Sequence, residues 1–515
     1  MTTGNDAPVA ITGPGASTNA AATREDGPQG GGTQEDGTQE GGPSAVDLVL
    51  PLAAVGAAGV AAGYGYIRRT RRARTRTTPG GAPTGPPSPK LGFARAGGPP
   101  SPLAELDGRA RASLVEADDC VRTSREELSF ALALFGTEPT EPYARAVREA
   151  EAELAAAFAM RQRYDEGVPA EEEARRHALA GIAGRCAEAG RRLDAEAVAF
   201  DRLRGLEQGA GAALEVAEAR FRELTGRTGV AEATLAGLGL RYGPGATAGV
   251  TGYVEQAKDR LVFATTRLNQ ARQAADRGEP EGAALHLRAA EGAVAQAAVF
   301  VDAVHRVATD LTAATEWLPA ALTGAEAQIA RVRVTGPEAG LGVPVGELRA
   351  RLLHADAVLD SVRQGVTSPR PYDPLELLRR VVRATAPLGA VRRGGVLSAA
   401  ASLVARGATA GAGGFVATHR GAVGAEARTR LAAAERRLAA EDLLTCDDLA
   451  GQARHLAEQD VRTHGNPYDG ATAHMSGLAG AVLGGVLLGV TPDDGTPPSF
   501  GGPRTRARRG RPATA

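Results

Sequence analysis

Apolar residues recur every three to four positions along most of the chain, which is the spacing of helices that bury one face. The first such stretch covers 103–135, and Gly136 ends it. A second stretch ends at Gly167. A third has the seven-residue repeat of a coiled coil, with apolar side chains at Leu179, Ile182, Cys186, Ala189, Leu193, Ala197, Phe200 and Leu203. Because short loops join these long helices, we predict an antiparallel, coiled-coil-like helical domain over 103–245.

Paired helical stretches continue in the second half of the chain. The pattern predicts a helical-hairpin domain over 250–395 and a shorter helical hairpin over 425–464. The shorter hairpin resembles 257–298, since Ala257, Arg260, Leu261 and Leu268 recur as Ala427, Arg430, Leu431 and Leu438. Either an internal duplication or a shared alanine-rich composition explains this likeness. Residues 396–424 are small, and we expect a flexible Gly/Ala linker there.

One stretch is apolar on every side. Residues 48–67, LVLPLAAVGAAGVAAGYGYI, carry no charge and would form a helix of about 30 Å, the thickness of a bilayer core. We therefore predict a transmembrane helix over 45–67. Acidic residues dominate the stretch before it, and arginines follow it at Arg68, Arg69, Arg71, Arg72, Arg74 and Arg76. By the positive-inside rule, we expect a single-pass protein of the cell membrane with its N-terminus outside and its C-terminal bulk in the cytoplasm.

The segments outside these helices have compositions that do not support a core. We expect a disordered polar tail over 1–44 and a basic stop-transfer and Pro/Gly linker over 68–102. Residues 465–515 combine a Gly-rich apolar run with a basic tail, which predicts either a partner-packing or interfacial segment or a poorly ordered end. The predicted fold class is all-α: one transmembrane helix, then long antiparallel helical-bundle or coiled-coil hairpins, with disordered termini.

Composition adds little to this picture. Aromatic residues make up 4% of the chain, which suits long helices, and the net charge of -1 gives no overall attraction for a polyanion. Nearly all the basic residues are arginine, as a high-GC genome would encode, so we expect no nucleic-acid partner. The three cysteines lie far apart within helical patterns, and we expect buried free thiols in a reducing compartment at Cys120, Cys186 and Cys446.

No motif with a known reaction mechanism is present in the sequence. There is no phosphate-binding GxxxxGK[ST], no HExxH and no GxSxG. Adjacent acids occur at Asp118-Asp119, Asp447-Asp448 and Asp493-Asp494, but neighbours on a helix point in different directions, so we expect that they cannot work together on one substrate atom. The histidines are scattered singly, and we expect solvated side chains at His177, His286, His305, His354, His419, His455, His464 and His474.

The sequence therefore predicts no catalytic, cofactor-binding or metal-binding residue, and we expect a protein that is not an enzyme. The expected partners are membrane lipid through 48–67, with anionic headgroups at the six arginines that follow, and an unknown protein partner or a second copy of the chain.

Four strings in the sequence are distinctive. They are the apolar span with RRTRRARTRTTPG, the run RASLVEADDCVRTSREELSFALALFG, the block YVEQAKDRLVFATTRLNQARQAADRGEPEGAALHLRAAEGAV, and the closing AGAVLGGVLLGV with PSFGGPRTRARRGR. Together they resemble the actinobacterial TPM-domain membrane proteins over about residues 45–515. In that family a secretory signal and a small α/β TPM domain precede the transmembrane helix, and the domain is associated with phosphatase activity and, in photosynthetic relatives, with membrane-protein quality control.

Here the low-complexity residues 1–44 stand where the TPM domain is expected, so no TPM functional residue is carried over. The resemblance implies a membrane-anchored cytoplasmic helical scaffold or interaction protein. Two alternatives stay open: a divergent TPM-type phosphatase or other hydrolase, or an accessory subunit of one, and a membrane-remodelling coiled coil like the phage-shock proteins.

Overall fold

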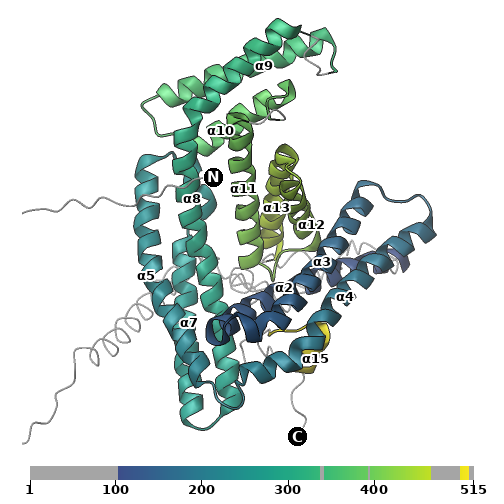
Figure 1. Ribbon diagram of the computed structural model, residues 1–515, viewed down its shortest axis with the longest axis vertical. Coiled ribbons are helices and arrows are strands. Elements are labelled where there is room, and N and C mark those ends of the chain that lie inside the picture. Colours follow the sequence, from purple (N-terminus) through teal and green to yellow (C-terminus); the bar gives the residue numbers. More distant parts are fainter. Residues whose placement is uncertain (1–101, 337–341, 392–394, 465–498, 510–515) are drawn as a thin grey trace, which may run out of the picture. The chain divides into compact units, whose positions relative to one another are not determined.

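The computed structural model describes the residues 102–336, 342–391, 395–464 and 499–509. Every regular element within these residues is a helix (Figure 1), which confirms the all-α class. The predictions for 1–44, for 45–67 and for nearly all of the linker over 68–102 concern residues outside this described part.

Three long helices open the described chain: α2 (Pro102–Phe135), α3 (Thr137–Glu166) and α4 (Glu172–Arg204). Gly136, at φ 78°, turns the chain between α2 and α3 within one residue, a backbone conformation that glycine adopts without a steric penalty. The three helices share one apolar core, which buries the predicted stripe of α4 at Leu179, Ile182, Cys186, Ala189, Leu193, Ala197 and Phe200.

A second core lies among the helices that follow, α5 (Gly211–Arg241), α7 (Tyr253–Asp276) and α8 (Pro280–Thr335). The short elements α6 (Pro244–Thr247) and η1 (Ala248–Val250) connect α5 to α7. The Tyr253 ring, at the start of α7, lies 5.0 Å from the ring of Phe300 in α8. Ala274, near the end of α7, adjoins Gly282 at the start of α8, so these two helices run in opposite directions.

The rest of the described chain consists of α9 (Val345–Thr367), α10 (Pro374–Thr385), η3 (Ala386–Leu388), α11 (Val396–Thr418), α12 (Ala425–Ala439) and α13 (Leu443–His464). Asp373 begins α10, because its carboxylate accepts the backbone N–H of Glu376 at 3.1 Å and satisfies a donor that the helix leaves unpaired. α12 packs against α2 and α3, and this contact joins the last helices of the chain to the first ones (Figure 1).

The flexible linker predicted over 396–424 is wrong for most of that range. Residues 396–418 form the helix α11, which contacts α8 and α13 and buries Ala400, Ala401, Val404 and Ala405. Alanine is the best helix former, and small side chains let neighbouring helices approach closely, so a run of small residues here makes a packed helix.

The poorly ordered basic tail predicted within 465–515 is also wrong where the structure describes it. Residues 499–509, which we call the C-terminal segment, include the short helix α15 (Pro503–Arg509), and this helix packs on α4 and α2. The apolar run before the C-terminal segment lies outside the described residues.

None of the described helices combines the length and the apolar character that a bilayer crossing requires. This finding contradicts the predicted transmembrane, single-pass cell-membrane protein. The stretch 48–67 and the arginines that follow it, on which that prediction and the lipid contacts rested, lie outside the described residues.

Candidate peptide-docking site

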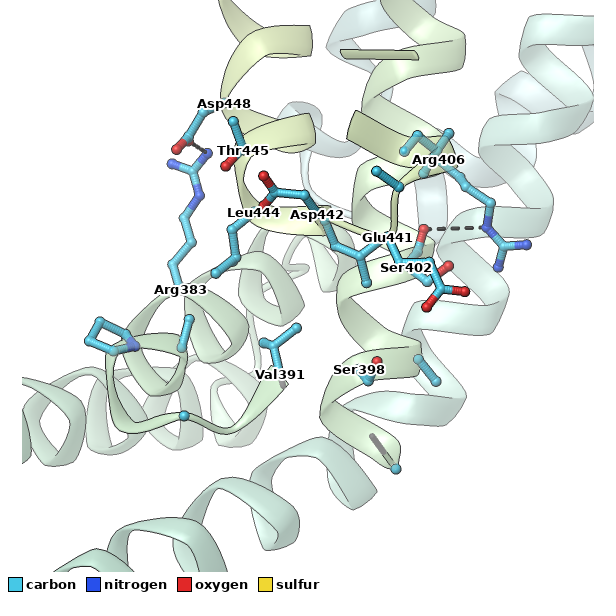
Figure 2. Close-up of a pocket in the computed structure, with 18 of the residues that line it drawn as sticks. Arg383, Val391, Ser398, Ser402, Arg406, Glu441, Asp442, Leu444, Thr445 and Asp448 are labelled. Atoms are coloured by element: carbon cyan, nitrogen blue, oxygen red, sulfur yellow. Dashed lines mark hydrogen bonds and ion pairs between the residues drawn. The ribbon is translucent and has the colours of Figure 1, made fainter. Parts of the chain in front are cut away.

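A cavity of about 1600 Å³ lies between η3, the start of α11 and the turn from α12 to α13 (Figure 2). Two of its arginines bind within the protein: Arg383 donates to Asp448 at 2.6 Å, and Arg406 donates from Nε to the carbonyl oxygen of Ser402 at 3.3 Å. The described lining residues include no histidine or cysteine. Hydroxyls of Ser398, Ser402 and Thr445 line the cavity together with the carboxylates of Glu441, Asp442 and Asp448.

A different part of the molecule binds a segment of the chain itself. The C-terminal segment lies on α2, α3 and α4, at a surface that we call the docking site, made by Ser124, Glu127, Tyr143, Gly190, Asp194 and Phe200. Phe500 is completely buried there. Its ring stacks on Phe200 with the centroids 4.3 Å apart and meets Tyr143 edge-on at 6.0 Å. Burial of such a ring contributes about 1.5–3 kcal/mol, and the aromatic contacts add specificity of orientation.

The backbone of the C-terminal segment is bound by side chains of α2 and α4. The N–H of Phe500 donates to Glu127 Oε2, and the N–H of Gly501 donates to Ser124 Oγ at 3.1 Å. The N–H of Gly502 donates to Asp194 Oδ1 at 2.9 Å. Three successive backbone donors therefore find acceptors, and burying the segment leaves none of them unpaired.

Asp194 also holds the start of α15. Its Oδ1 accepts the backbone N–H of Thr505 at 3.0 Å and the hydroxyl of Thr505 at 2.6 Å, in addition to the N–H of Gly502. Helix starts leave their first N–H groups without partners, and a carboxylate there is favoured by both hydrogen bonding and the helix dipole. A residue of α4 thus does for α15 what an N-cap residue of the same helix usually does.

Two glycines cross where the C-terminal segment passes over α4. A Cβ atom built on Gly190 would lie 2.7 Å from Cδ of Pro503, and one built on Gly502 would overlap the carbonyl oxygen of Gly190. Gly501 has φ 132°, a conformation that other residues rarely adopt. A side chain at Gly502 would therefore meet the backbone of Gly190, whereas one at Gly190 would meet Pro503 and one at Gly501 would meet Thr505.

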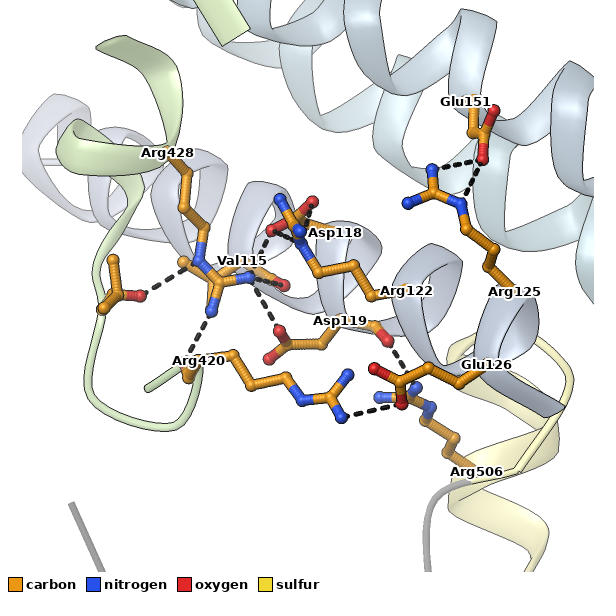
Figure 3. A network of polar contacts seen from close by, with 11 residues as sticks. Val115, Asp118, Asp119, Arg122, Arg125, Glu126, Glu151, Arg420, Arg428 and Arg506 are labelled. Atoms are coloured by element: carbon orange, nitrogen blue, oxygen red, sulfur yellow. Dashed lines mark hydrogen bonds and ion pairs between the residues drawn. The ribbon is translucent and has the colours of Figure 1, made fainter. Parts of the chain in front are cut away.

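The docking site continues along α2 into a buried network of charges, which Arg506 of the C-terminal segment joins (Figure 3). Arg506 donates to the carbonyl oxygen of Asp119 at 2.8 Å. Arg428, on α12, donates from the single nitrogen Nη1 to Asp118 at 2.6 Å and to Asp119 at 2.7 Å. Arg420 pairs with Glu126 at 2.8 Å. One face of α2 thus binds the C-terminal segment, while the neighbouring face binds Arg420 of the α11–α12 connection and Arg428 of α12.

These contacts bring adjacent aspartates together on one arginine nitrogen, although neighbours on a helix point in different directions. Asp118 and Asp119 meet on one nitrogen of Arg428, and Asp447 and Asp448 both accept from Nη2 of Arg383, at 2.7 and 2.6 Å. Neighbours on a helix do diverge by about 100°. A long arginine that approaches from another helix between the two directions nevertheless reaches both carboxylates.

The charges in the network support one another. Burial alone raises the pKa of Asp118, but the guanidinium groups of Arg122 and Arg428 outweigh burial and lower that pKa below its ordinary value. Burial likewise opposes the charge of Arg420, and Glu126 reverses the effect and raises the pKa of Arg420. The network is therefore held together by charged groups that stabilise each other's ionised forms.

The three cysteines are buried free thiols, as predicted. Burial raises the pKa of Cys120 and of Cys186 to about 12 in each case, and it also raises the pKa of Cys446. A thiol with such a pKa stays protonated near neutral pH and is a poor nucleophile.

The prediction for the histidines is wrong at His419, whose side chain is buried and stacks on Phe415 with the ring centroids 4.2 Å apart. His177, His354 and His455 are exposed, whereas His286 and His305 are half-buried. The side chains of His464 and His474 lie outside the description, as does the Asp493-Asp494 pair. Across the described residues, no three His, Cys, Asp or Glu side chains are grouped as a metal site requires.

The sequence prediction missed the docking site, although two local signals point to it. Asp118 falls on the apolar stripe of α2, between Leu114 and Val121, where a charge requires a partner. In the tail, a single phenylalanine is followed by Gly-Gly-Pro among otherwise polar and basic residues. Each signal marks an unusual position, but neither indicates which part of the protein that position contacts.

Comparison with known proteins identifies relatives but no activity. Two curated proteins from two strains of Mycobacterium tuberculosis, each named as a UPF0603 protein, are 32% identical to this chain over 438 residues. The match covers 78% of this chain and 65% of each relative. No protein-family model matches the chain. No solved structure matches it either.

Proposed function

We propose that this protein is a helical scaffold or interaction protein that binds short protein segments at the docking site and has no catalytic site of its own. As part of the same proposal, the described helices form antiparallel, coiled-coil-like hairpins that present this site. The observation that carries it is the way the C-terminal segment is bound, with a buried aromatic anchor and a row of paired backbone donors.

This mode of binding is general in peptide recognition. Main-chain hydrogen bonds supply affinity for an extended segment, and a pocket for one large side chain supplies selectivity. Phe500 fills that role, and Ser124, Glu127 and Asp194 supply the acceptors from two helices. Because the acceptors lie on packed helices, they are held in position before the segment arrives.

The acidic groups of the site are committed to binding. Glu127 accepts the Phe500 N–H on one oxygen and Nε of Arg288 on the other, the latter at 3.2 Å. Asp194 receives three donors on one oxygen. Carboxylates engaged in this way favour a structural role over general acid or base catalysis. The relation to TPM-domain proteins belongs to the same proposal and rests on the four strings of the sequence.

A binding experiment tests the proposal. The receptor is the full-length chain with Phe500→Ala and Gly502→Ala, which weakens the hold of its own C-terminal segment. The probe is a fluorescent peptide with the sequence of residues 499–509, and the control probe has alanine in place of phenylalanine. We expect saturable binding of the first peptide, and binding at least about tenfold weaker for the control, because about 1.4 kcal/mol or more of ring burial is lost.

Two outcomes would overturn the proposal. One is the absence of saturable binding by a receptor that retains its helical circular dichroism. The other is steady turnover of a generic phosphate ester by the purified wild-type protein with added divalent metal, since this would favour the hydrolase alternative.

A further inference from the structure

We infer that the docking site is selective for a Phe-Gly-Gly-Pro-x-Thr signature, and that the chain's own C-terminal segment is a tethered competitor for every other chain with that signature. This inference rests on the proposed function and deepens it, because it names the class of ligand and the way in which access is limited.

Steric exclusion supplies the first part of the selectivity. The backbone of Gly502 passes directly over the backbone of Gly190, so that an added Cβ on Gly502 would lie 2.7 Å from the Gly190 carbonyl carbon. The site therefore rejects any ligand with a side chain at this position. Gly501 adds a second restriction, since a Cβ there would lie 2.8 Å from Cβ of Thr505. A peptide needs two consecutive glycines after its aromatic residue to fit.

Hydrogen bonding supplies the second part. Asp194 Oδ1 accepts from the N–H of Gly502 and from both the N–H and the hydroxyl of Thr505. Thr505 is buried, so loss of its hydroxyl would leave the half-buried carboxylate oxygen of Asp194 with one donor fewer. Pro503 suits the position between them, because the first residue of a helix needs no N–H and proline has none. The spacing from the glycine to the threonine is thus part of the signature.

The covalent connection makes the segment a competitor. Residues 465–498 join the end of α13 to the C-terminal segment, so the ligand and its site are parts of one chain. An intramolecular ligand does not become scarcer when the protein is diluted, whereas a ligand on another molecule does. A second protein with the signature must therefore displace the chain's own segment before it binds.

The inference is tested with four full-length proteins and one set of labelled peptides. The proteins are the wild type, the Phe500→Ala/Gly502→Ala variant, Gly190→Ala, and Gly184→Ala as a matched control on the same helix, where an added Cβ meets nothing within 4 Å. The peptides carry the sequence of residues 499–509, unchanged, with Gly502→Ala, or with Thr505→Val.

We expect the unchanged peptide to bind the Phe500→Ala/Gly502→Ala protein at least about tenfold more tightly than it binds the wild type, because the tethered competitor has been weakened. Gly184→Ala should match the wild type. Gly190→Ala should bind the unchanged peptide at least about tenfold more weakly than the Phe500→Ala/Gly502→Ala protein does, because the added methyl group meets Pro503. The peptides with Gly502→Ala and Thr505→Val should bind the Phe500→Ala/Gly502→Ala protein at least about tenfold more weakly than the unchanged peptide.

Failures of the inference and of the proposed function differ in this design. Equal affinity of the wild type and the Phe500→Ala/Gly502→Ala protein for the unchanged peptide would show that the chain's own segment does not compete, and it would leave the proposed binding function in place. Equal affinity for all three peptides would show that the site is not selective for the Phe-Gly-Gly-Pro-x-Thr signature. Light scattering that gives twice the chain mass for the wild type, but not for the Phe500→Ala/Gly502→Ala protein, would assign the segment to a second copy and overturn competition within one chain. Binding of no peptide by any protein would overturn the proposed function itself.

Discussion

The two described pairs of adjacent aspartates repeat one arrangement in different surroundings. On α2, Asp118 and Asp119 converge on one nitrogen of Arg428, whose side chain is 1% exposed. On α13, Asp447 and Asp448 converge on one nitrogen of Arg383, whose side chain is 50% exposed. The distances are nearly the same, between 2.6 and 2.7 Å.

Burial, rather than distance, decides how much each arrangement matters. Exposed ion pairs contribute about 0–1 kcal/mol, because water solvates the separated charges almost as well. Removal of one member of a buried pair costs about 3–5 kcal/mol, because the remaining charge stays in a medium that solvates it poorly. Arg428 also donates to the carbonyl oxygens of Val423 at 3.1 Å and Arg420 at 2.6 Å, so its guanidinium holds a loop in place as well as two acids.

The largest loss of stability is expected on substitution of Arg428. We expect Arg428→Ala to lower the free energy of unfolding by about 3 kcal/mol, near the lower end of the range for buried pairs because Arg122 still contacts Asp118 at 2.9 Å. Urea denaturation followed by circular dichroism measures this change. Arg430→Ala, on the same helix and half-buried, is the control and should change stability by less than about 1 kcal/mol. Similar losses for both variants would contradict the role of burial.

His419 is a buried group whose charged form is destabilised, because it lies near two arginines and has no acidic partner among the causes of its pKa shift. Burial lowers the pKa of His419 from 6.5 to about 4, a hydrogen bond to Phe415 O opposes this, and Arg260 and Arg454 lower the pKa further. Between pH 6.5 and about 4, the His419 ring is therefore protonated in the unfolded chain and neutral in the folded protein. The stability that the neutral ring contributes is complete above pH 6.5 and is lost as the pH falls through about 4, a change of about 3 kcal/mol at most.

Urea denaturation at a series of pH values between 7 and 4 measures this loss, and His419→Gln is the variant that removes the titrating group. We expect the slope of unfolding free energy against pH to be smaller in His419→Gln. An unchanged slope would show that another group titrates in this window.

The contact between α4 and the C-terminal segment can be weakened without touching either aspartate pair. Gly190→Ala places a methyl group 2.7 Å from Pro503 Cδ, and overpacking of this kind costs about 1–3 kcal/mol. We expect trypsin to cleave after Arg504 and Arg506 about tenfold faster in this variant, because the segment leaves its site more often. Gly184→Ala is the control, with cleavage as in the wild type. Equal rates in both variants would show that the crossing does not hold the segment.

The smallest effect is expected at the half-exposed Arg383. Arg383→Ala should change the free energy of unfolding by about 0.5 kcal/mol, since half of its side chain already faces water and Arg379 still contacts the buried Asp447 at 3.2 Å. The same urea experiment checks this value, and high salt should shrink the difference from the wild type further. A loss as large as that of Arg428→Ala would mean that shared contact with two aspartates, and not burial, sets the strength of both arrangements.

Much of the helical framework follows from local pattern. The predicted stretch 103–135 agrees closely with α2, and the heptad-like stripe of α4 is buried almost throughout, because the spacing of apolar residues acts within a few turns. Burial of the cysteines could be predicted for the same reason, since each lies on such a stripe. The pattern fails at α11, where small residues are compatible with either a packed helix or a loose linker.

The partners across the chain could not be predicted in this way. The apparent repeat aligns Arg260, which is buried, with Arg430, which is half-buried, whereas the buried arginine of α12 is Arg428. Which arginine faces Asp118 depends on how α12 rotates against α2, and these residues are 310 positions apart. No spacing rule reaches over such a separation.

The sequence by itself determined that this chain is helical, where most of its described helices lie, and that Asp118 and the Phe-Gly-Gly-Pro string are unusual for their surroundings. Tertiary structure alone decided that Arg428 neutralises Asp118 and that Phe500 stacks on Phe200. Periodicity acts through hydrogen bonds and contacts within a helix, which neighbouring residues set. A docking site requires side chains from several helices to meet, and that meeting depends on the packing of the whole described assembly.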